Sequence, residues 1–284
     1  MISVLQLGTL DYATGLRLQK KLIDLRKENR IGDVLLLLEH TPVITLGRNA
    51  KAANVIASSD QLAQRGVEVF ECDRGGDVTF HGPGQIVGYP IFDLRGFPST
   101  DGKRQTLGVI EYVRRLEEVL IRTCAEFGIP AERICKLTGV WTRHEPVELR
   151  STRTLRLRSG QANEDARPYT SEPGKIAALG VHISRSVTSH GFALNVNTDL
   201  NYFNLIIPCG IASKPVTSMA HELGKPVDAI EVANSIVRYF GEVFQSQILW
   251  VEILDALLGE TVGVPMTVPA NLREIHKPKE NFWV

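Results

Sequence analysis

Apolar residues recur at helical spacing in two long stretches of the chain. Leu18, Leu22 and Leu25 lie three and four positions apart among basic residues, and Asp11 occupies the position of an N-cap. The stretch 107–127 has the same periodicity, with apolar positions at Val113, Leu116, Leu120, Cys124 and Phe127. The pattern therefore predicts helices over 11–29 and 107–127.

Shorter apolar runs, bounded by polar residues, glycine or proline, predict strands. The run VLLLLEH (34–40) is continuous, which is typical of a strand that is buried on both faces. The same reasoning predicts strands over 42–47, 67–72, 138–141, 175–184, 191–197 and 203–210, and helices near 226–241 and 248–258. Because strands and helices are mixed without a regular βαβ period, we expect an α+β fold.

The segment RGGDVTFHGPGQIVGYPI (74–91) combines a strand-like alternation with five glycines and two prolines. Glycine is favoured where the backbone must approach a ligand closely or adopt positive φ. The segment therefore predicts a rigid hairpin or a bent strand that presents Arg74, Thr79, His81 and Gln85. An ordinary glycine-rich turn without a ligand would give the same pattern, so the segment needs support from elsewhere in the chain.

Composition and charge narrow the class of protein. The 284 residues, 43% hydrophobic and 23% charged, suit one large soluble domain or two small ones. Lysine plus arginine and aspartate plus glutamate balance at 32 each, so no overall field favours nucleic acid or a membrane surface. No run approaches the ~18 apolar residues of a spanning helix. We expect a cytoplasmic protein without nucleic-acid or membrane partners.

The four cysteines have no CxxC spacing and are expected to be reduced thiols. Cys124 belongs to the apolar stripe of a helix and is interpreted as a small core residue, as are Cys72 and Cys135 beside predicted strands. The histidines and cysteines show no metal-ligand spacing, so we expect no metal.

Several segments together are similar to the lipoyl(octanoyl) transferase family. They are LGTLDYATGLRLQ (7–19), EHTPVITLGR (39–48), RGGDVTFHGPGQ (74–85), TGVW (138–141), GKIAALGVHI (174–183), SHGFALNVNTDL (189–200), PCGI (208–211) and TSM (217–219). The combination is specific and covers the chain from Leu7 to about Phe240, apart from one insert. Enzymes of this family move an octanoyl group from acyl carrier protein to a lysine of a lipoyl domain.

The resemblance implies the fold of biotin- and lipoate-protein ligase catalytic domains, a central mixed sheet backed by helices. We therefore expect a catalytic domain over 1–245 and a C-terminal helix and tail over 246–284 that packs on it. Residues 143–173 depart from the family, which needs only a short connection there, and are expected to be an inserted mobile loop. Its basic run at 150–158 could recruit an acidic carrier protein, but the insert is almost neutral as a whole, which favours a loop without that role.

The resemblance also implies the catalytic residues. Cys209 would form an acyl-thioester, and Lys175 would promote its ionisation and shuttle protons. Chemically this is sound, because a free thiol with a pKa of ~8.5 is only slightly ionised at neutral pH and a nearby ammonium favours the thiolate. Without the motif, Lys175 would read as a solvated lysine at a strand end.

The family's substrate-binding positions fall on three segments of this chain. They are Arg74, Gly75, Gly76, Asp77, Val78, Thr79, Phe80 and His81; Ala178, Leu179 and Gly180; and Gly191, Phe192 and Ala193. Val78, Phe80, Leu179 and Phe192 could form the wall of an acyl tunnel. His81 and His190 could orient the catalytic pair or merely hydrogen-bond a loop; His182 is interpreted as structural and His40 as a possible brace.

The predicted donor is octanoyl-acyl carrier protein. The predicted acceptors are the lipoyl domains of 2-oxoacid dehydrogenases and the glycine cleavage H protein. No cofactor is expected, and the family is usually monomeric. An ATP-dependent lipoate-protein ligase of the same fold is the main alternative; the chain lacks a Walker A loop, since Pro226 follows Gly224-Lys225. A non-catalytic acyl-binding module and a thiol hydrolase are weaker alternatives.

Overall fold

The computed structural model describes residues 1–100, 105–143, 172–208 and 214–252. Its strands are β1 (Ile2–Leu10), β2 (Asp33–His40), β3 (Val43–Leu46), β4 (Glu68–Glu71), β5 (Val78–His81), β6 (Gln85–Ile91), β7 (Ala131–Ile134), β8 (Leu137–Thr142), β9 (Lys175–Ser184), β10 (Val187–Asn195) and β11 (Ile248–Trp250). The helices are α1 (Tyr12–Lys27), α2 (Ser59–Gln64), α3 (Val109–Glu126), α4 (Met219–Leu223) and α5 (Ala229–Phe244), with 3-10 helices η1 (Ala52–Asn54), η2 (Leu94–Gly96) and η4 (Leu200–Leu205).

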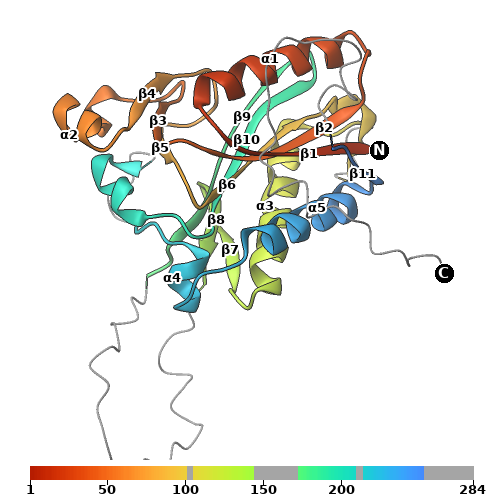
Figure 1. Ribbon diagram of the computed structural model, residues 1–284. Helices are drawn as coiled ribbons and strands as arrows, with labels where there is room; N and C mark the ends of the chain where they lie inside the picture. Colours follow the sequence, from red (N-terminus) through yellow and green to blue (C-terminus); the bar gives the residue numbers. More distant parts are fainter. Residues whose placement is uncertain (101–104, 144–171, 209–213, 253–284) are drawn as a thin grey trace, which may run out of the picture.

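A mixed sheet forms the centre of the described structure, in the order β11-β1-β2-β6-β10-β9-β8-β7. Strand β1 pairs parallel with β2 and β11, whereas β6, β10, β9, β8 and β7 pair antiparallel with their neighbours. Figure 1 shows α1 on one side of this sheet and α3 with α5 on the other. The predicted α+β class with a central mixed sheet backed by helices is confirmed.

Strand β2 is buried on both faces, as its continuous apolar run predicts. Val34, Leu36 and Leu38 pack in the cluster beneath α1. Leu35 and Leu37 pack in the larger cluster that α3 and α5 cover. The two faces follow from the period-two alternation of a strand.

The predicted long helices are also confirmed. The side chain of Asp11 caps α1 by accepting from the backbone N–H of Thr14 at 2.8 Å. Cys124 of α3 is fully buried, and burial raises the pKa of its thiol to about 12, as suits a core residue. Cys135, by contrast, is exposed and Cys72 is half-buried, so the prediction that Cys135 belongs to the core is wrong. None of the helices in the described ranges is both long and apolar enough to cross a membrane.

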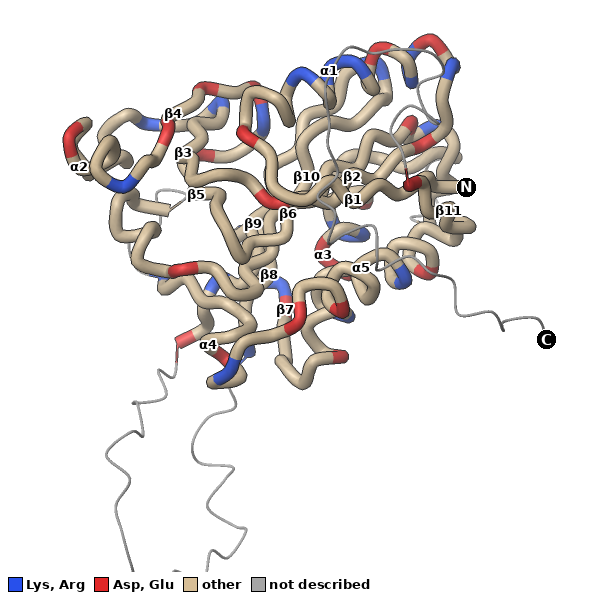
Figure 2. Tube along the Cα trace, viewed as in Figure 1, with Lys and Arg blue, Asp and Glu red and all other residues tan. Residues whose placement is uncertain are grey.

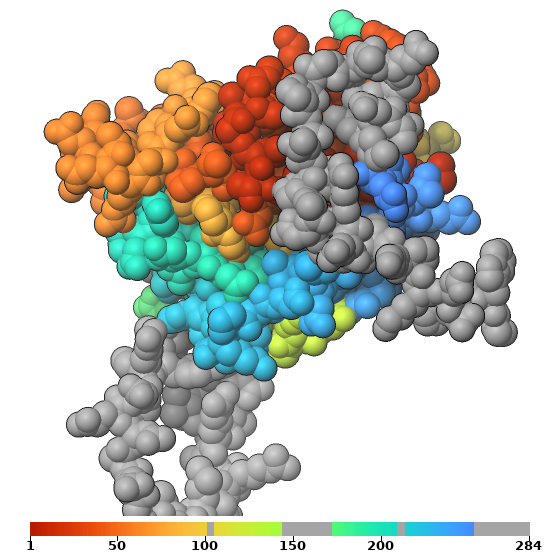
Figure 3. All heavy atoms as spheres, viewed as in Figure 1, coloured from red at the N-terminus to blue at the C-terminus, as the bar shows by residue number. Residues whose placement is uncertain are grey.

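A second, smaller sheet has the order β4-β3-β5 and packs on residues of η4. In Figure 3 the residues of this sheet lie against the segment before 208 at one end of the molecule. Strand β5 pairs with β3 in the small sheet, whereas β6 pairs with β2 and β10 in the main sheet. The glycine-rich segment is therefore a bent strand that passes between two sheets, one of its two predicted forms.

Gly84 makes the bend between β5 and β6 possible. Its φ is +78°, and a Cβ there would lie 2.7 Å from the backbone carbonyl of Asn197. The loop 82–84 thus rests directly on the chain that follows β10.

Two predictions at the C-terminal side of the sheet are wrong. Residues 203–210 were expected to form a strand, but Phe203–Leu205 belong to the 3-10 helix η4, and among the described residues 206–208 only Ile206 makes an isolated bridge, to Val55. Residues 248–258 were expected to form a helix, but 248–250 form strand β11, which extends the main sheet beside β1, and 253–258 lie outside the described residues. Both segments are short apolar runs, for which periodicity does not distinguish helix from strand.

The greater part of the predicted insert (144–171), Cys209 and the tail from 253 onward lie outside the described residues. Figure 2 shows acidic and basic positions interspersed along the described chain, in keeping with the equal counts of the two signs in the sequence.

Candidate active site

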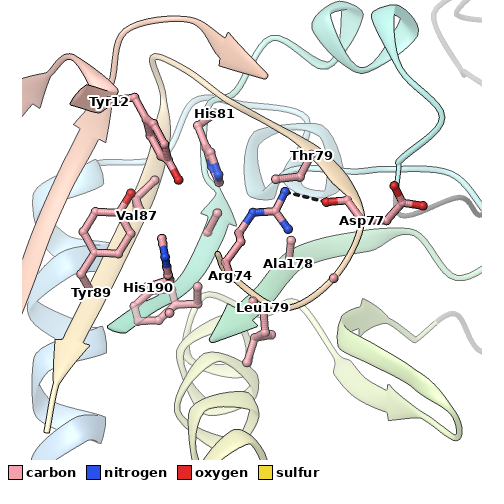
Figure 4. A pocket seen from close by; sticks show the side chains of 15 residues that line it. Tyr12, Arg74, Asp77, Thr79, His81, Val87, Tyr89, Ala178, Leu179 and His190 are labelled. Atoms are coloured by element: carbon pink, nitrogen blue, oxygen red, sulfur yellow. Dashed lines mark hydrogen bonds between the residues drawn. The ribbon is translucent and has the colours of Figure 1, made fainter. Parts of the chain in front are cut away.

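A pocket lies between the two sheets, beside the start of α1 (Figure 4). Every predicted substrate-binding residue lines it except Gly75, Val78 and Phe80. The lining residues are Tyr12, Arg74, Gly76, Asp77, Thr79, His81, Val87, Tyr89, Ala178, Leu179, Gly180, His190, Gly191, Phe192 and Ala193. The fold thus brings together the three segments that the sequence singled out.

Val78 and Phe80 do not line this pocket. They alternate with Thr79 and His81 along β5, so their side chains point to the opposite face of the small sheet. Phe80 stacks on Tyr202 at 4.7 Å between ring centroids, within a cluster that also contains Val78. The expectation that these two residues form the wall of an acyl tunnel is therefore corrected by strand geometry.

Arg74 holds the loop 74–77 over the pocket. Its buried guanidinium donates to the hydroxyl and carbonyl oxygens of Thr45, at 2.9 and 2.7 Å, and to the carbonyl of Asp77 at 2.7 Å (Figure 4). A Cβ at Gly47 would lie 2.8 Å from Nη1 of Arg74, and one at Gly180 would lie 3.3 Å from its Cδ. Glycine at these positions leaves the space that the arginine fills.

The loop is also fastened to the strand below it. The backbone N–H of Gly75 donates to the carbonyl of Val181 at 3.0 Å. Asp77 accepts from the side-chain amide of Asn54 at 2.7 Å and from the N–H of Val78 at 2.7 Å. These bonds show why the polar members of RGGD are needed for the shape of the pocket as well as for its lining.

His81 points into the pocket with a defined tautomer. The side-chain amide of Gln85 donates to the carbonyl of Phe80 at 3.2 Å and to Oδ1 of Asn195 at 2.8 Å, so its Oε1 must accept from Nδ1 of His81 at 2.8 Å. Nε2 is then an acceptor. Because burial lowers the pKa of His81 to about 3, the ring is neutral at physiological pH and has no acidic proton to donate there.

His40 braces the pocket wall, as its position in EHTP suggested. Its Nδ1 donates to the carbonyl of Leu10 at 3.0 Å, so its Nε2 accepts from the hydroxyl of Tyr89 at 2.6 Å. Tyr89 in turn lines the pocket. Burial lowers the pKa of His40 to about 4, which keeps this arrangement intact at neutral pH.

His190 lies where the pocket meets Asp73. Its backbone has a positive φ of +54°, and its Nε2 lies 2.7 Å from Oδ1 of Asp73. The other oxygen of Asp73 pairs with Nδ1 of His182 at 2.6 Å. Burial lowers the pKa of His190, against the opposing effect of the Asp73 carboxylate. His182 therefore has the structural role predicted for it, in fixing this carboxylate.

Lys175 lines a second, smaller cavity that adjoins the first. It is lined by Thr79, Gln85, Lys175, Ala178, Ala193, Asn195, Phe203, Pro208 and Val216. Thr79, Ala178 and Ala193 line both cavities, so only small side chains stand between the lysine and the pocket. The side chain of Lys175 is buried, with Nζ 5.4 Å from the ring centroid of Trp141.

Lys175 carries the one amine among the described side chains that line the second cavity. Pro208, the residue before Cys209, lines the same cavity as Lys175. Cys209 itself is outside the described residues, so its pairing with Lys175 stays a prediction. Within the described ranges, no group of three or more His, Cys, Asp or Glu side chains could hold a metal ion.

Sequence reasoning missed Tyr12, Val87 and Tyr89 as lining residues. Tyr12 reads as the first apolar position of a helix, and the other two as core positions of a strand. The only signal in the sequence was the alternation of Val87 and Tyr89 with Ile86 and Gly88. This alternation indicates that Val87 and Tyr89 share one face of β6 once the pairing of β6 with β10 is known.

The burial of His40 and His81 predicts a loss of stability in mild acid. Both folded-state pKa values lie below the unfolded value of about 6.5, so the unfolded chain binds more protons as the pH falls below about 6.5. Below pH 6.5, each of these two histidines therefore lowers the free energy of unfolding by up to about 1.4 kcal/mol per pH unit, until the pH reaches its folded-state pKa.

We expect the free energy of unfolding, measured with urea between pH 7 and 5, to fall less steeply in His81→Gln than in the wild type. His221→Gln, which alters an exposed histidine, is the matched control and should keep the wild-type slope. Equal slopes in all three proteins would show that His81 is not held neutral.

Comparison with known proteins places these features in a family. Residues 11–241 match the model of the family described as "Lipoyl protein ligase A/B catalytic domain". The chain is 56% identical over 277 residues to an octanoyltransferase of Koribacter versatilis, covering 98% of each chain. It is 51% identical to an octanoyltransferase of Acidobacterium capsulatum, covering 92% of this chain and 97% of the relative.

Solved structures with a similar fold are much more distant in sequence. A bipartite lipoate protein ligase from Thermoplasma acidophilum has a TM-score of 0.59 at 15% identity, covering 89% of this chain and 87% of its own. LipL1 of P. falciparum, solved in complex with lipoate, has a TM-score of 0.57 at 12% identity and covers 92% and 75%. At these identities the likeness concerns the fold.

Proposed function

Since this chain belongs to the lipoyl protein ligase A/B catalytic domain family, we propose that it is an acyltransferase that transfers octanoyl groups to lipoyl domains in protein lipoylation. The observation that carries the proposal is the 56% identity to an octanoyltransferase across 98% of both chains. The pocket supports it, because most of the residues that the resemblance assigns to substrate binding line it.

We propose octanoyl-acyl carrier protein as the donor and Cys209 as the nucleophile. The thiolate of Cys209 attacks the carbonyl carbon of the donor thioester, and the bond to the carrier's sulfur breaks. Lys175 gives its proton to the departing thiolate, so that the carrier leaves as a thiol. The new thioester is nearly isoenergetic with the old one, which makes this step reversible and easy.

The second step returns both groups to their starting state. The amine of the acceptor lysine attacks the acyl-enzyme, an amide bond forms, and Cys209 leaves as a thiolate. The proton lost by the attacking amine goes to the neutral amine of Lys175, which again becomes an ammonium. The acceptors would be lipoyl domains of 2-oxoacid dehydrogenases and the glycine cleavage H protein; the cytoplasmic location and monomeric state stay predictions.

The pocket between the sheets would hold the octanoyl chain. It adjoins the lysine cavity, and β9 and β10 line it with Leu179 and Phe192 as well as with glycine and alanine. Burying each methylene contributes about 0.8 kcal/mol, so a pocket of limited depth favours chains that fill it. The acceptor nitrogen of His81 and the hydroxyl of Thr79 would lie along the same pocket.

An ATP-dependent lipoate ligase has the same fold and is the alternative. The two functions separate in one assay, with an unlipoylated lipoyl domain as acceptor. We expect modification with octanoyl-acyl carrier protein in the absence of ATP, and none with free octanoate plus ATP and magnesium. The reverse pattern would make the protein a ligase.

Ala193 offers a test of the acyl path, because it lines both cavities. We expect Ala193→Leu to place a bulky side chain at the junction and to exclude part of the chain. Displacing two methylenes would cost about 1.6 kcal/mol, or about 15-fold in kcat/KM with the octanoyl donor.

The effect of this change should depend on chain length. An acetyl donor, which needs no space beyond the junction, should lose much less with Ala193→Leu. Ala193→Gly, which adds no volume, is the control and should stay within about threefold for both donors. Equal losses with acetyl and octanoyl donors would show that the chain does not pass Ala193.

A further inference from the structure

The side chain of Lys175 lies against strand β8. Trp141 is its cross-strand partner in the β8–β9 pairing, and Nζ lies 5.4 Å from the Trp141 ring centroid. Trp141 is almost completely buried, with 1% of its surface exposed. A buried indole at this distance attracts a cation through the negative face of its ring and restricts where the ammonium can lie.

Gly139, two residues before Trp141 on strand β8, also lies against the side chain of Lys175. A Cβ at this position would lie 2.6 Å from Cε of Lys175 and 3.4 Å from its Nζ. The glycine also has φ +134°, a conformation that residues with side chains rarely adopt. The end of the lysine side chain thus occupies space that any other residue at 139 would fill.

Gly139 is fixed to helix α3 through Glu117. The N–H of Gly139 donates to Oε1 of Glu117 at 3.3 Å, and the buried carboxylate of Glu117 is paired with Arg114 at 2.7 Å and with Arg133 at 3.1 Å. The pairing of β8 with β9 is irregular between Val140 and Trp141. This irregularity lets the strand direct Gly139 and Trp141 at the same lysine.

The backbone of Lys175 is equally constrained. Its N–H donates to the carbonyl of Pro215 at 2.8 Å, and its carbonyl accepts from the N–H of Thr217 at 3.0 Å. With the main chain held by these bonds, the rotamer of the side chain decides where the ammonium lies. That rotamer is restricted by Gly139 and Trp141.

We propose that Gly139 and Trp141 are positioning residues, which form a slot that holds the ammonium of Lys175 in its working place. The proposal deepens the proposed function and rests on the role given there to Lys175. It explains why the TGVW segment carries glycine and tryptophan two positions apart. Neither residue touches the reacting atoms; both act through the lysine.

The test is a double-mutant cycle in the full-length protein. Gly139→Ala should displace the flexible end of Lys175 and lower kcat at least about 10-fold, with KM for octanoyl-acyl carrier protein within about twofold. In a Lys175→Ala background the same change should cause no further loss, since the displaced side chain is gone. Iodoacetamide labelling of Cys209 at pH 6.5 should show the same non-additivity.

Backbone strain needs its own control. Gly128 also has a positive φ, of +79°, but a Cβ there would meet nothing within 4 Å. Gly128→Ala should therefore lower the melting temperature through strain while leaving kcat unchanged. If Gly139→Ala does not fold, Trp141→Phe and Trp141→Leu take its place. Trp141→Phe should retain more of kcat than Trp141→Leu. In a Lys175→Ala background neither substitution should lower kcat further.

The outcomes distinguish a failure of the positioning proposal from a failure of the proposed function. Losses that add fully to that of Lys175→Ala, or a Gly139→Ala protein with wild-type kcat, would overturn the slot. If Lys175→Ala alone keeps wild-type turnover, the role of the lysine in the proposed function fails, whatever residue 139 does.

Discussion

Replacing Cys209 with alanine is expected to abolish transfer of the octanoyl group. Without a thiol no acyl-enzyme can form, and the acceptor amine would have to attack the carrier thioester directly. Removing the nucleophile of an enzyme that acts through a covalent intermediate lowers kcat by several orders of magnitude, here at least about 10⁴-fold. Transfer is measured by mass spectrometry of the lipoyl domain at a saturating donor concentration.

The other three cysteines serve as matched controls. Cys135 is exposed and Cys72 is half-buried, so alanine at either should change kcat little. Cys124 is fully buried in α3, and its replacement should cost about 1 kcal/mol of stability without loss of turnover. Substantial transfer by Cys209→Ala, or a comparable loss in one of the controls, would mean that the nucleophile has been misassigned.

Lys175→Ala is expected to have the second-largest effect on turnover. In the proposed mechanism the ammonium would favour the thiolate before attack and supply the proton that the departing carrier takes up, so both steps should slow when it is lost. General acid–base catalysis contributes about 10²–10⁴-fold, which sets the size of the expected fall in kcat. Among the described residues that line the cavity of Lys175 there is no other lysine or arginine that could take over its role.

The pH dependence of thiol alkylation distinguishes this role from a structural one. Lys175→Ala should slow the reaction of Cys209 with iodoacetamide most between pH 6 and 7, where the thiolate fraction is limiting. Above pH 9 an ordinary thiol with a pKa of ~8.5 is largely ionised, so the difference should shrink. Identical pH–alkylation profiles for the two proteins would exclude electrostatic activation by Lys175.

The hydrophobic pattern predicted the longer elements. The apolar spacing after Asp11 fits a helix, and the continuous apolar run of β2, bounded by polar residues, fits a buried strand. Residues 203–205 and 248–250 are apolar runs too short to show a period, and their structures depend on what they pack against. Leu205 and Ile206 join the cluster beneath the small sheet, and Ile248 adds to the edge of the main sheet.

The candidate site, like the fold, could be predicted only in part from the sequence. Sequence motifs identified the chain segments that meet at the pocket, because glycine, arginine and histidine are informative residue types. They could not give the face on which each side chain lies, which is why Val78 and Phe80 were misplaced. Nor could they identify Tyr12 and Tyr89, whose contribution depends on the position of α1 and on the register of β6 against β10.

Direct observation of the acyl-enzyme tests the central claim of covalent octanoyl transfer. Purified protein is incubated with octanoyl-acyl carrier protein, without ATP and without acceptor, and its intact mass and tryptic peptides are measured. The account predicts a single octanoyl adduct on Cys209, absent from Cys209→Ala and lost when an unlipoylated lipoyl domain is added, as that domain gains the same mass. A lipoyl domain that becomes octanoylated while Cys209 never carries the adduct, or an adduct that requires ATP, would contradict it.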